Sequence, residues 1–374
     1  MKKSKTPNIS AISSRKILDS RSEWTIETTI KMGDVSGVAS VPCGTSVGSF
    51  EAKSLPVSLA LEKIEFIRSK IVGRTFNSQE ELDKMLLELD GTNDKRNLGA
   101  NVILSISLAF ARSFAAVKKI PLYQYVSECY GDPSFSFNKP KMMMLIFEGG
   151  KHGSSNISIQ EFMVVVNSVD EGDKVYDLAR KTLLSKKLEV EVGLEGAFSP
   201  VGFLNTEILE LLSSLSNNSI ALDIASSSVD NDLDFKQMLG KYNIFSIEDP
   251  FGEEEWEKWV QFTKIYGDEV LVVGDDLVVT NPKRIQKAID LKACNAVIIK
   301  PNQIGTLTET LQAIKLAKDN GLKVVVSHRS GETNDSFISD LAIGVNAEFV
   351  KFGSPSRGER VAKYNRLLEI FENM

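Results

Sequence analysis

Six residues that could bind a metal or move a proton recur at nearly even spacing in the second half of the chain. They are Asp223, Glu248, Asp275, Lys300, His328 and Lys351, separated by 25, 27, 25, 28 and 23 residues. Each follows a short run of apolar, largely β-branched residues, which is typical of a parallel strand buried on both faces. Each step has the length of one strand and one helix with their connections, so the pattern predicts successive βα units. In a barrel of such units, the carboxyl ends of the strands meet at one mouth.

The first three of these residues predict a metal site. Asp223, Glu248 and Asp275 lie at consecutive strand ends and offer only carboxylate oxygens, which suit Mg²⁺ or Mn²⁺. A carboxylate at a barrel mouth can also simply pair with a basic residue, so the common spacing of the three carries the inference. Lys300 could be a solvated surface lysine. Beside a divalent cation and away from water, however, its pKa would fall and it could act as a general base.

A second set of candidates comes from outside this spacing. Glu161 in IQEFMVV and Glu195 in VGLEGAF supply a second pair of acids. The chain has only two histidines, His152 in EGGKHGSSN and His328 in SHRSGET, and both lie in loops rich in Gly and Ser. Hydrogen-bonded histidines at a domain surface are the alternative interpretation of both.

Arg329 and Ser330 indicate the charge of the substrate. They directly follow His328 at a predicted strand end, and a guanidinium beside a hydroxyl is suited to a phosphate or a carboxylate. This favours a doubly anionic small molecule. The formal net charge of −6, without a basic tail or stripe, argues against a nucleic-acid partner.

Length and patterning predict two domains. The 374 residues exceed what a single core comfortably holds. Residues 1–133 first alternate as in an antiparallel sheet, with a hairpin turn at Gly33-Asp34, and then become helical, which predicts an α+β domain. A cluster of Gly, Pro and Ser near Ser134 marks the boundary, and residues 134–374, beginning with the strand MMMLIFEGG, form the predicted barrel domain.

Composition also predicts a cytoplasmic protein without a membrane span. The basic start of the chain is followed by no apolar signal region, and we find no apolar run of about 18 residues. The three cysteines are odd in number and far apart, which predicts reduced thiols instead of disulfides or structural zinc.

Ordered motifs along nearly the whole chain resemble those of the enolase family. They read ILDSR, VPCGTSVGSFEA, NLGANVILSISLAFA, PLYQY, GGKHGSSN, QEFM, SIEDP, KPNQIGTLTET, SHRSGET and SRGERVAKYN. The resemblance implies an eight-stranded αβ barrel after a small α+β domain, and the loss of water from 2-phosphoglycerate to give phosphoenolpyruvate. By the family pattern Asp223, Glu248 and Asp275 would hold one Mg²⁺, and Ser46 would help to bind a second when its loop closes. A homodimer is also implied.

The resemblance assigns the remaining roles as well. Lys300 would remove the proton from carbon 2, while Glu195 and Glu161 would assist the departing hydroxyl. The substrate-binding residues would be His152, Glu161, His328, Arg329, Ser330 and Lys351, with Lys351 on the carboxylate, Arg329 and Ser330 on the phosphate, and His152 closing over the site.

The chain also departs from the family pattern close to these residues. Leu194 stands where an acid usually precedes the catalytic glutamate, and Glu148 stands where an asparagine usually precedes GGKH. Val47 replaces a threonine in the second-metal loop, and Pro301 follows the base lysine. Such residues can set the orientation and pKa of their neighbours. The alternatives are therefore an impaired enolase-like scaffold protein, or a related lyase that acts on another carboxylic acid.

Overall fold

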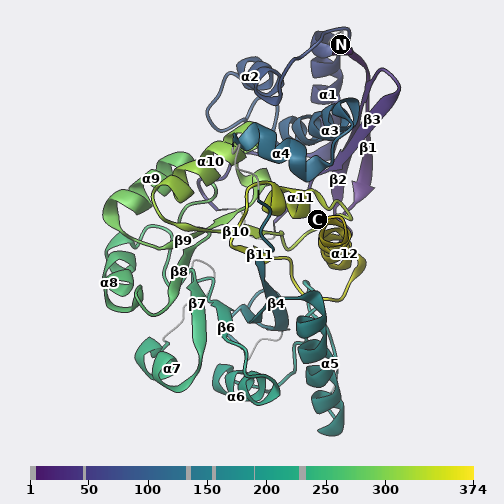
Figure 1. Cartoon of the computed structure of the whole chain (residues 1–374). Coiled ribbons are helices and arrows are strands. Elements are labelled where there is room, and N and C mark those ends of the chain that lie inside the picture. The colour runs from purple at the N-terminus through teal and green to yellow at the C-terminus, as the bar shows by residue number, and fades with distance from the viewer. Residues whose placement is uncertain (1–5, 45–47, 132–135, 154–156, 189, 227–232) are drawn as a thin grey trace.

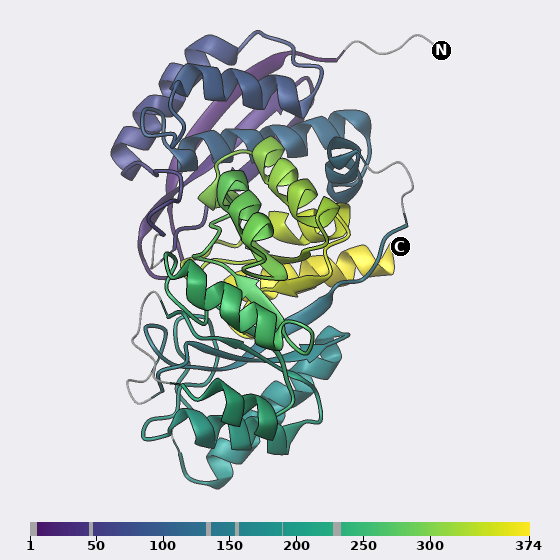
Figure 2. The ribbon, with the colours of Figure 1, turned by 90° about the vertical axis from the view of Figure 1, so that its left-hand side faces the viewer.

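The computed structural model describes residues 6–44, 48–131, 136–153, 157–188, 190–226 and 233–374. A small α+β domain packs against one side of a closed αβ barrel (Figures 1 and 2). The first domain contains β1 (Ile9–Leu18), β2 (Trp24–Met32), β3 (Val35–Ser40), α1 (Val57–Ile71), α2 (Gln79–Asp90), α3 (Ala100–Lys118) and α4 (Leu122–Tyr130). The boundary predicted near Ser134 lies outside the described residues and stays a prediction.

The N-terminal sheet is antiparallel in the order β1-β2-β3. Met32 pairs with Val35 across the predicted turn, and Gly33 has a φ of +58°, a conformation that glycine adopts at little cost. Helix α3 packs on this sheet. A Cβ at Gly37 would lie 2.2 Å from the carbonyl oxygen of Ala109, so a glycine is needed where the helix approaches the strand.

Helix α3 is long and apolar enough to cross a membrane by length and composition alone. In the structure, however, 83% of its apolar window is buried inside the protein. It is therefore the core helix of the N-terminal domain, and its burial, which the sequence does not show directly, accounts for its apolar composition.

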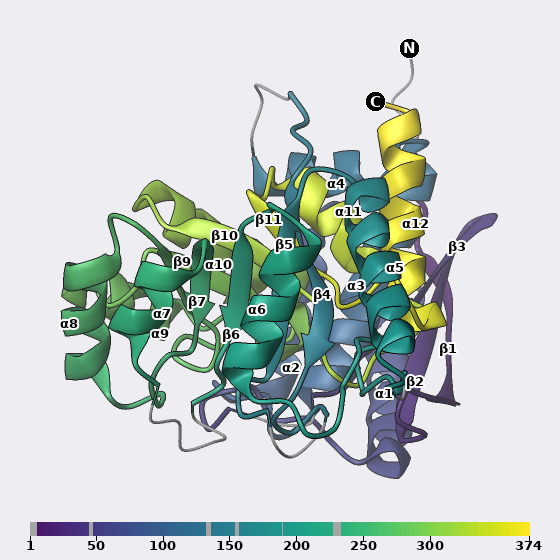
Figure 3. The ribbon, with the colours of Figure 1, turned by 90° about the horizontal axis from the view of Figure 1, so that it is seen from below.

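The second domain is the predicted eight-stranded barrel. Its elements are β4 (Lys141–Glu148), β5 (Glu161–Val166), α5 (Val169–Ser185), α6 (Asn205–Leu215), β6 (Ile220–Asp223), α7 (Phe235–Lys241), β7 (Ile244–Glu248), α8 (Trp256–Tyr266), β8 (Leu271–Gly274), α9 (Pro282–Leu291), β9 (Ala296–Ile299), η1 (Pro301–Gln303), α10 (Leu307–Asp319), β10 (Lys323–Ser327), α11 (Phe337–Gly344), β11 (Phe349–Lys351) and α12 (Gly358–Glu372). The closed strand order is β10-β11-β4-β5-β6-β7-β8-β9. Figure 3 shows the strands from below, with helices around them.

Strand direction differs at one position in the barrel. The predicted strands β6 to β11 pair in parallel, whereas β5 is antiparallel to both β4 and β6. As a result Glu161, the first residue of β5, lies opposite Glu148 and Asp223, which end their strands. The reversed strand therefore brings its starting residue to the mouth where the other strands end.

Polar contacts hold the N-terminal domain on the barrel. Asp83 of α2 is fully buried and its carboxylate accepts hydrogen bonds from the amide and the hydroxyl of Thr308, at 2.9 and 2.6 Å. Arg112 of α3 forms a two-pronged ion pair with Asp335, with both distances 2.7 Å. These contacts join helices α2 and α3 to the barrel domain.

Candidate active site

The barrel mouth brings the predicted residues together. Of the predicted residues that the structure describes, all except Glu248 line one cavity, namely His152, Glu161, Glu195, Asp223, Asp275, Lys300, His328, Arg329, Ser330 and Lys351. Glu248 contacts Lys351 beside this cavity. Ser46, the predicted ligand of a second metal, and Val47 lie outside the described residues.

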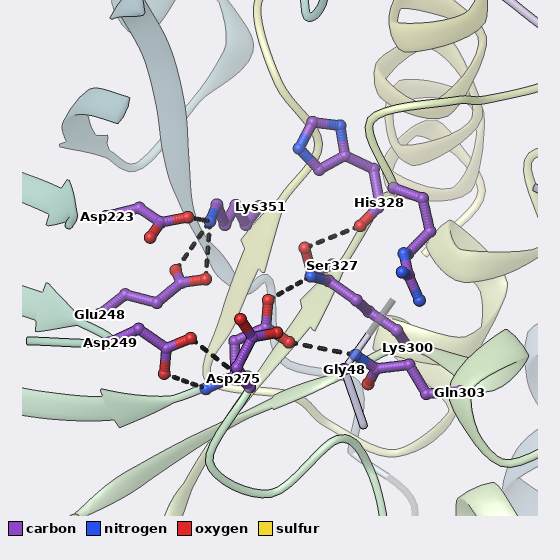
Figure 4. A network of polar contacts seen from close by, with 12 residues as sticks. Gly48, Asp223, Glu248, Asp249, Asp275, Lys300, Gln303, Ser327, His328 and Lys351 are labelled. Carbon is purple, nitrogen blue, oxygen red and sulfur yellow. Dashed lines mark hydrogen bonds and ion pairs between the residues drawn. The ribbon is translucent and has the colours of Figure 1, made fainter. Parts of the chain in front are cut away.

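Three acids surround the ammonium group of Lys351, and Figure 4 shows two of them, Asp223 and Glu248. Its Nζ donates to Asp223 Oδ2 at 2.9 Å and to both Glu248 oxygens at 2.8 Å, and it lies 3.2 Å from Glu161 Oε2. Burial by itself lowers the pKa of Lys351, but Asp223, Glu161 and Glu248 outweigh burial and raise this pKa well above its ordinary value. The carboxylates of Asp223 and Glu248 are therefore already directed at one cation.

Asp275, the third predicted metal ligand, pairs with Lys300 instead of Lys351. Lys300 Nζ forms a short hydrogen bond to Asp275 Oδ2, and Gln303 Nε2 donates to Asp275 Oδ1 at 3.3 Å. Burial lowers the pKa of Lys300, but Asp275 outweighs burial and raises it. The predicted fall of this pKa depends on a bound cation and stays a prediction. The three predicted ligands thus do not converge on one point here, because Asp275 faces Lys300 whereas Asp223 and Glu248 face Lys351.

Asp249 is a residue that sequence reasoning missed. Its two carboxylate oxygens accept the amides of Asp275 and Asp276, at 2.9 and 2.8 Å, and so fix the end of β8. Oxygen atoms of Asp249, Asp275 and Asp276 lie within 4.8 Å of one another. The donors are all oxygen, as Mg²⁺ prefers, so the residues around Asp275 fit such an ion. The position of Asp249 directly after Glu248, in the motif SIEDP, was the sequence signal that could have identified it.

Glu195 lies between the two histidines. Its Oε2 is 3.2 Å from His328 Nε2, and its Oε1 is 3.7 Å from His152 Nδ1. Arg360, fully buried, has its Nη1 2.7 Å from His328 Nδ1. Because a guanidinium can only donate, Nδ1 must accept, and the imidazole proton is on Nε2, facing Glu195. Burial lowers the pKa of His328 to about 3, so this ring is neutral.

The acid pair is asymmetric. Burial, and then the charge of Glu195, raise the pKa of Glu161 well above its ordinary value, although Lys351 opposes the rise. Burial also acts to raise the pKa of Glu195, but the adjacent His328 and His152 outweigh it and hold this pKa well below its ordinary value. Of the two carboxyl groups, Glu161 therefore binds a proton more readily than Glu195.

Arg329 is already paired with an acid that sequence reasoning missed. Glu51, from the N-terminal domain, accepts from both terminal nitrogens of Arg329 at 3.0 and 3.1 Å. Asn302 Oδ1 lies 3.3 Å from the same guanidinium. Burial lowers the pKa of Arg329, but Glu51 outweighs it and raises this pKa, so the side chain is charged. Glu51 is the second-last residue of the motif VPCGTSVGSFEA. Its place in this motif was the sequence signal that Glu51 could lie near the barrel mouth.

Comparisons with known proteins identify the family of both domains. The model of the enolase N-terminal domain matches residues 9–126, and that of the enolase C-terminal TIM barrel domain matches residues 136–239 and 226–374. Two curated relatives, both called enolase, are each 39% identical to this chain over 98% of its length. They come from Beutenbergia cavernae and Bdellovibrio bacteriovorus, and the alignments cover 95% and 96% of their chains. The chain therefore belongs to the enolase family and is a hydro-lyase of the phosphopyruvate hydratase type.

Proposed function

We propose that this chain dehydrates 2-phosphoglycerate to phosphoenolpyruvate in a Mg²⁺-dependent reaction, with Lys300 as base and the Glu195–Glu161 pair as acid. One observation carries the proposal. In the closed strand order β9, which precedes Lys300, lies four strands away from β5, which begins with Glu161, so the two groups face each other across the barrel. A substrate between them could lose a proton on one side and a hydroxyl on the other.

The base step requires cations near the substrate. A proton next to an ionised carboxylate is weakly acidic, because its removal creates a second negative charge close to the first. Lys300 would take this proton from carbon 2 once its ammonium group is released from Asp275 and deprotonated. Lys351 would bind the substrate carboxylate and stabilise the charge that develops there.

Asp223, Glu248 and Asp275 would hold one Mg²⁺, and Ser46 would contribute to a second. In this structure each of these three carboxylates pairs with an ammonium group, which supports a site built for positive charge. Bound Mg²⁺ would neutralise the developing charge of the substrate carboxylate. Competition between the metal and the two lysines would also free Lys300 and Lys351 for the substrate.

The acid step uses the other side of the cavity. Hydroxide is a poor leaving group and needs a proton from a neighbouring acid. The proton that Glu161 and Glu195 share would serve this purpose, with Glu195 oriented by His328 and with His152 closing over the site. Two carboxyls held close together can keep one proton near neutral pH, because ionisation of both is unfavourable.

Arg329 and Ser330 would bind the substrate phosphate. A phosphate offers the guanidinium the same two-pronged contact that Glu51 offers here, and it carries more charge. Substrate binding would therefore displace Glu51 from Arg329. The family resemblance adds the expectation of a homodimer, for which light scattering of the purified protein is the test.

Formation of phosphoenolpyruvate, followed by its ultraviolet absorbance with and without Mg²⁺, tests the proposal. Turnover that depends on Mg²⁺ is expected. Folded protein that binds Mg²⁺ and a phosphonate analogue of the substrate but shows no turnover would contradict it. Failure to bind the analogue would favour a scaffold protein.

A further inference from the structure

Glu148, the last residue of β4, binds the backbone of the segment that contains Glu195. Its side chain is fully buried. Its Oε1 accepts the amide of Ala197 at 2.9 Å, and its Oε2 accepts the amide of Glu195 itself at 3.1 Å. One carboxyl group therefore binds the main chain at Glu195 and two residues beyond it.

Glu195 lies in residues 190–200, and this described segment forms turns and isolated bridges but no helix or named strand. Phe198 forms isolated bridges with Val192 and with Phe147 of β4. The amide of Glu148 also donates to the carbonyl of Phe198 at 3.0 Å. Glu148 thus supplies both main-chain and side-chain contacts to this segment. The hydroxyl of Tyr176 also donates to the carbonyl of Gly196 at 2.8 Å, and the amide of Ser354 donates to the carbonyl of Glu195 at 3.3 Å.

The segment encloses the Glu148 carboxyl closely. A Cβ at Gly193 would lie 2.5 Å from Glu148 Cδ, so a larger residue at this position would collide with the carboxyl group. The amide of Leu194 donates to the carbonyl of His152 at 3.1 Å, which joins the same segment to the histidine loop. The backbone around Glu195 is therefore held on one side by Glu148 and on the other by the histidine loop.

We propose that Glu148 is a positioning residue of the reaction, whose carboxyl group fixes the Glu195 backbone and thereby directs the Glu195 side chain at the leaving hydroxyl. The inference rests on the proposed function of Glu195. Two departures from the family pattern agree with this inference: an acid, Glu148, precedes GGKH, and the residue before Glu195 is Leu194 instead of an acid. In this chain the acid beside the catalytic glutamate is supplied by β4 instead of by the adjacent residue.

The charge of Glu148 is compatible with this role. Burial, and then the charge of Glu195, raise the pKa of Glu148 to about 8, while the two accepted amides and Arg360 act to lower it. Near neutral pH the group is therefore largely protonated. Both oxygens of a protonated carboxyl group keep lone pairs that can accept the two amides, and the neutral group adds little negative charge beside Glu195.

Two partial reactions test the role: exchange of the carbon 2 proton with solvent, which needs Lys300, and dehydration, which needs Glu195. Glu148→Leu and Glu148→Asn remove or shorten the acceptor, and Glu148→Gln keeps one acceptor of the same length. We expect the first two variants to lose dehydration on the order of 10²-fold, the cost of a misplaced catalytic group, and to retain exchange. Glu148→Gln should restore most of the dehydration rate.

Asp90 offers a matched control in the N-terminal domain. Its buried carboxylate also accepts two amides, those of Thr92 and Leu98, at 2.9 and 2.7 Å. Asp90→Leu should lower thermal stability but leave the ratio of dehydration to exchange unchanged. Thermal melts and circular dichroism establish that each variant is folded, and Glu148→Asn, which keeps a polar side chain, tests the role if Glu148→Leu does not fold.

Three outcomes would overturn the inference while the wild type is active: equal loss of exchange and dehydration, full dehydration in Glu148→Asn, or no rescue by Glu148→Gln. An inactive wild type would instead overturn the proposed function, so the two failures are distinguishable.

Discussion

The two halves of the barrel mouth neutralise their buried acids in different ways. The lysine half consists of Asp223, Glu248, Asp275, Lys300 and Lys351, and there each carboxylate meets an ammonium group. The histidine half consists of His152, Glu161, Glu195 and His328, with Glu148 behind it. There Glu195 meets a neutral imidazole and Glu148 meets backbone amides, while Glu161 lies at the border of the two halves, 3.2 Å from Lys351 Nζ.

This difference follows from the cost of burying charge. A buried carboxylate needs either a counter-charge or hydrogen bonds and a proton. An ammonium counter-charge can be exchanged for another cation, which supports the lysine half as the metal site and the source of the base. The neutral imidazole and the backbone amides bring no positive charge, so one proton can remain on the pair formed by Glu161 and Glu195. This supports the histidine half as the acid.

The largest expected effect breaks the lysine half. Lys300→Ala should reduce carbon 2 proton exchange and turnover by about 10³-fold, within the range of general-base contributions. Exchange is measured as loss of the carbon 2 proton of the substrate in deuterated buffer. Lys315→Ala, at an exposed lysine of α10, is the control and should leave both rates unchanged. Retained exchange in Lys300→Ala would remove the base assignment.

Breaking the histidine half should separate the two steps. Glu195→Gln should preserve carbon 2 exchange but lower phosphoenolpyruvate formation by about 10²-fold, because an amide cannot share the proton of the acid pair with Glu161. The same two assays measure both rates. If Glu195→Gln and Lys300→Ala lose exchange equally, the division into a base half and an acid half is wrong.

Metal binding sharpens the comparison further. Asp275→Asn should weaken Mg²⁺ binding in the absence of substrate by roughly 30-fold, about 2 kcal/mol, because a charged oxygen donor is lost. Ser46→Ala should weaken it less, since its metal is expected to arrive with substrate. Isothermal titration with Mg²⁺ alone measures both. Equal losses would contradict a resident and a substrate-recruited metal.

The smallest effect concerns the neutral histidine. The folded-state pKa of His328, about 3, lies below the ordinary value of 6.5, so the unfolded state binds the proton more tightly between these values. The stability that His328 contributes is present above pH 6.5 and is lost as the pH falls towards 3, by up to about 1.4 kcal/mol per pH unit. Urea unfolding of wild type and of His328→Gln at pH 6.5 and 5.5 measures this loss. The free energy of unfolding should fall more between the two pH values in wild type than in His328→Gln. A ¹⁵N spectrum should show the proton on Nε2 at both pH values, and a protonated ring at pH 5.5 would refute the assignment.

The sequence alone determined the barrel, the N-terminal α+β domain and many of the residues around the cavity, although not Glu51 or Asp249. Buried strands can be recognised from local runs of β-branched residues. The repeated βα unit explains the even spacing of Asp223, Glu248, Asp275, Lys300 and His328. These signals depend on residues close together along the chain, so they can be recognised without knowing the packing.

Only the tertiary structure decided which of these groups contact each other. The reversal of β5, the pairing of Arg329 with Glu51 of the other domain, and the contact of Glu148 with the Glu195 backbone all join segments far apart in sequence. The protonation of Glu161 and His328 likewise depends on burial and on neighbours that packing supplies. Spacing along a chain identifies the strand end that a residue occupies, whereas its counter-charge and its proton depend on what folding places beside it.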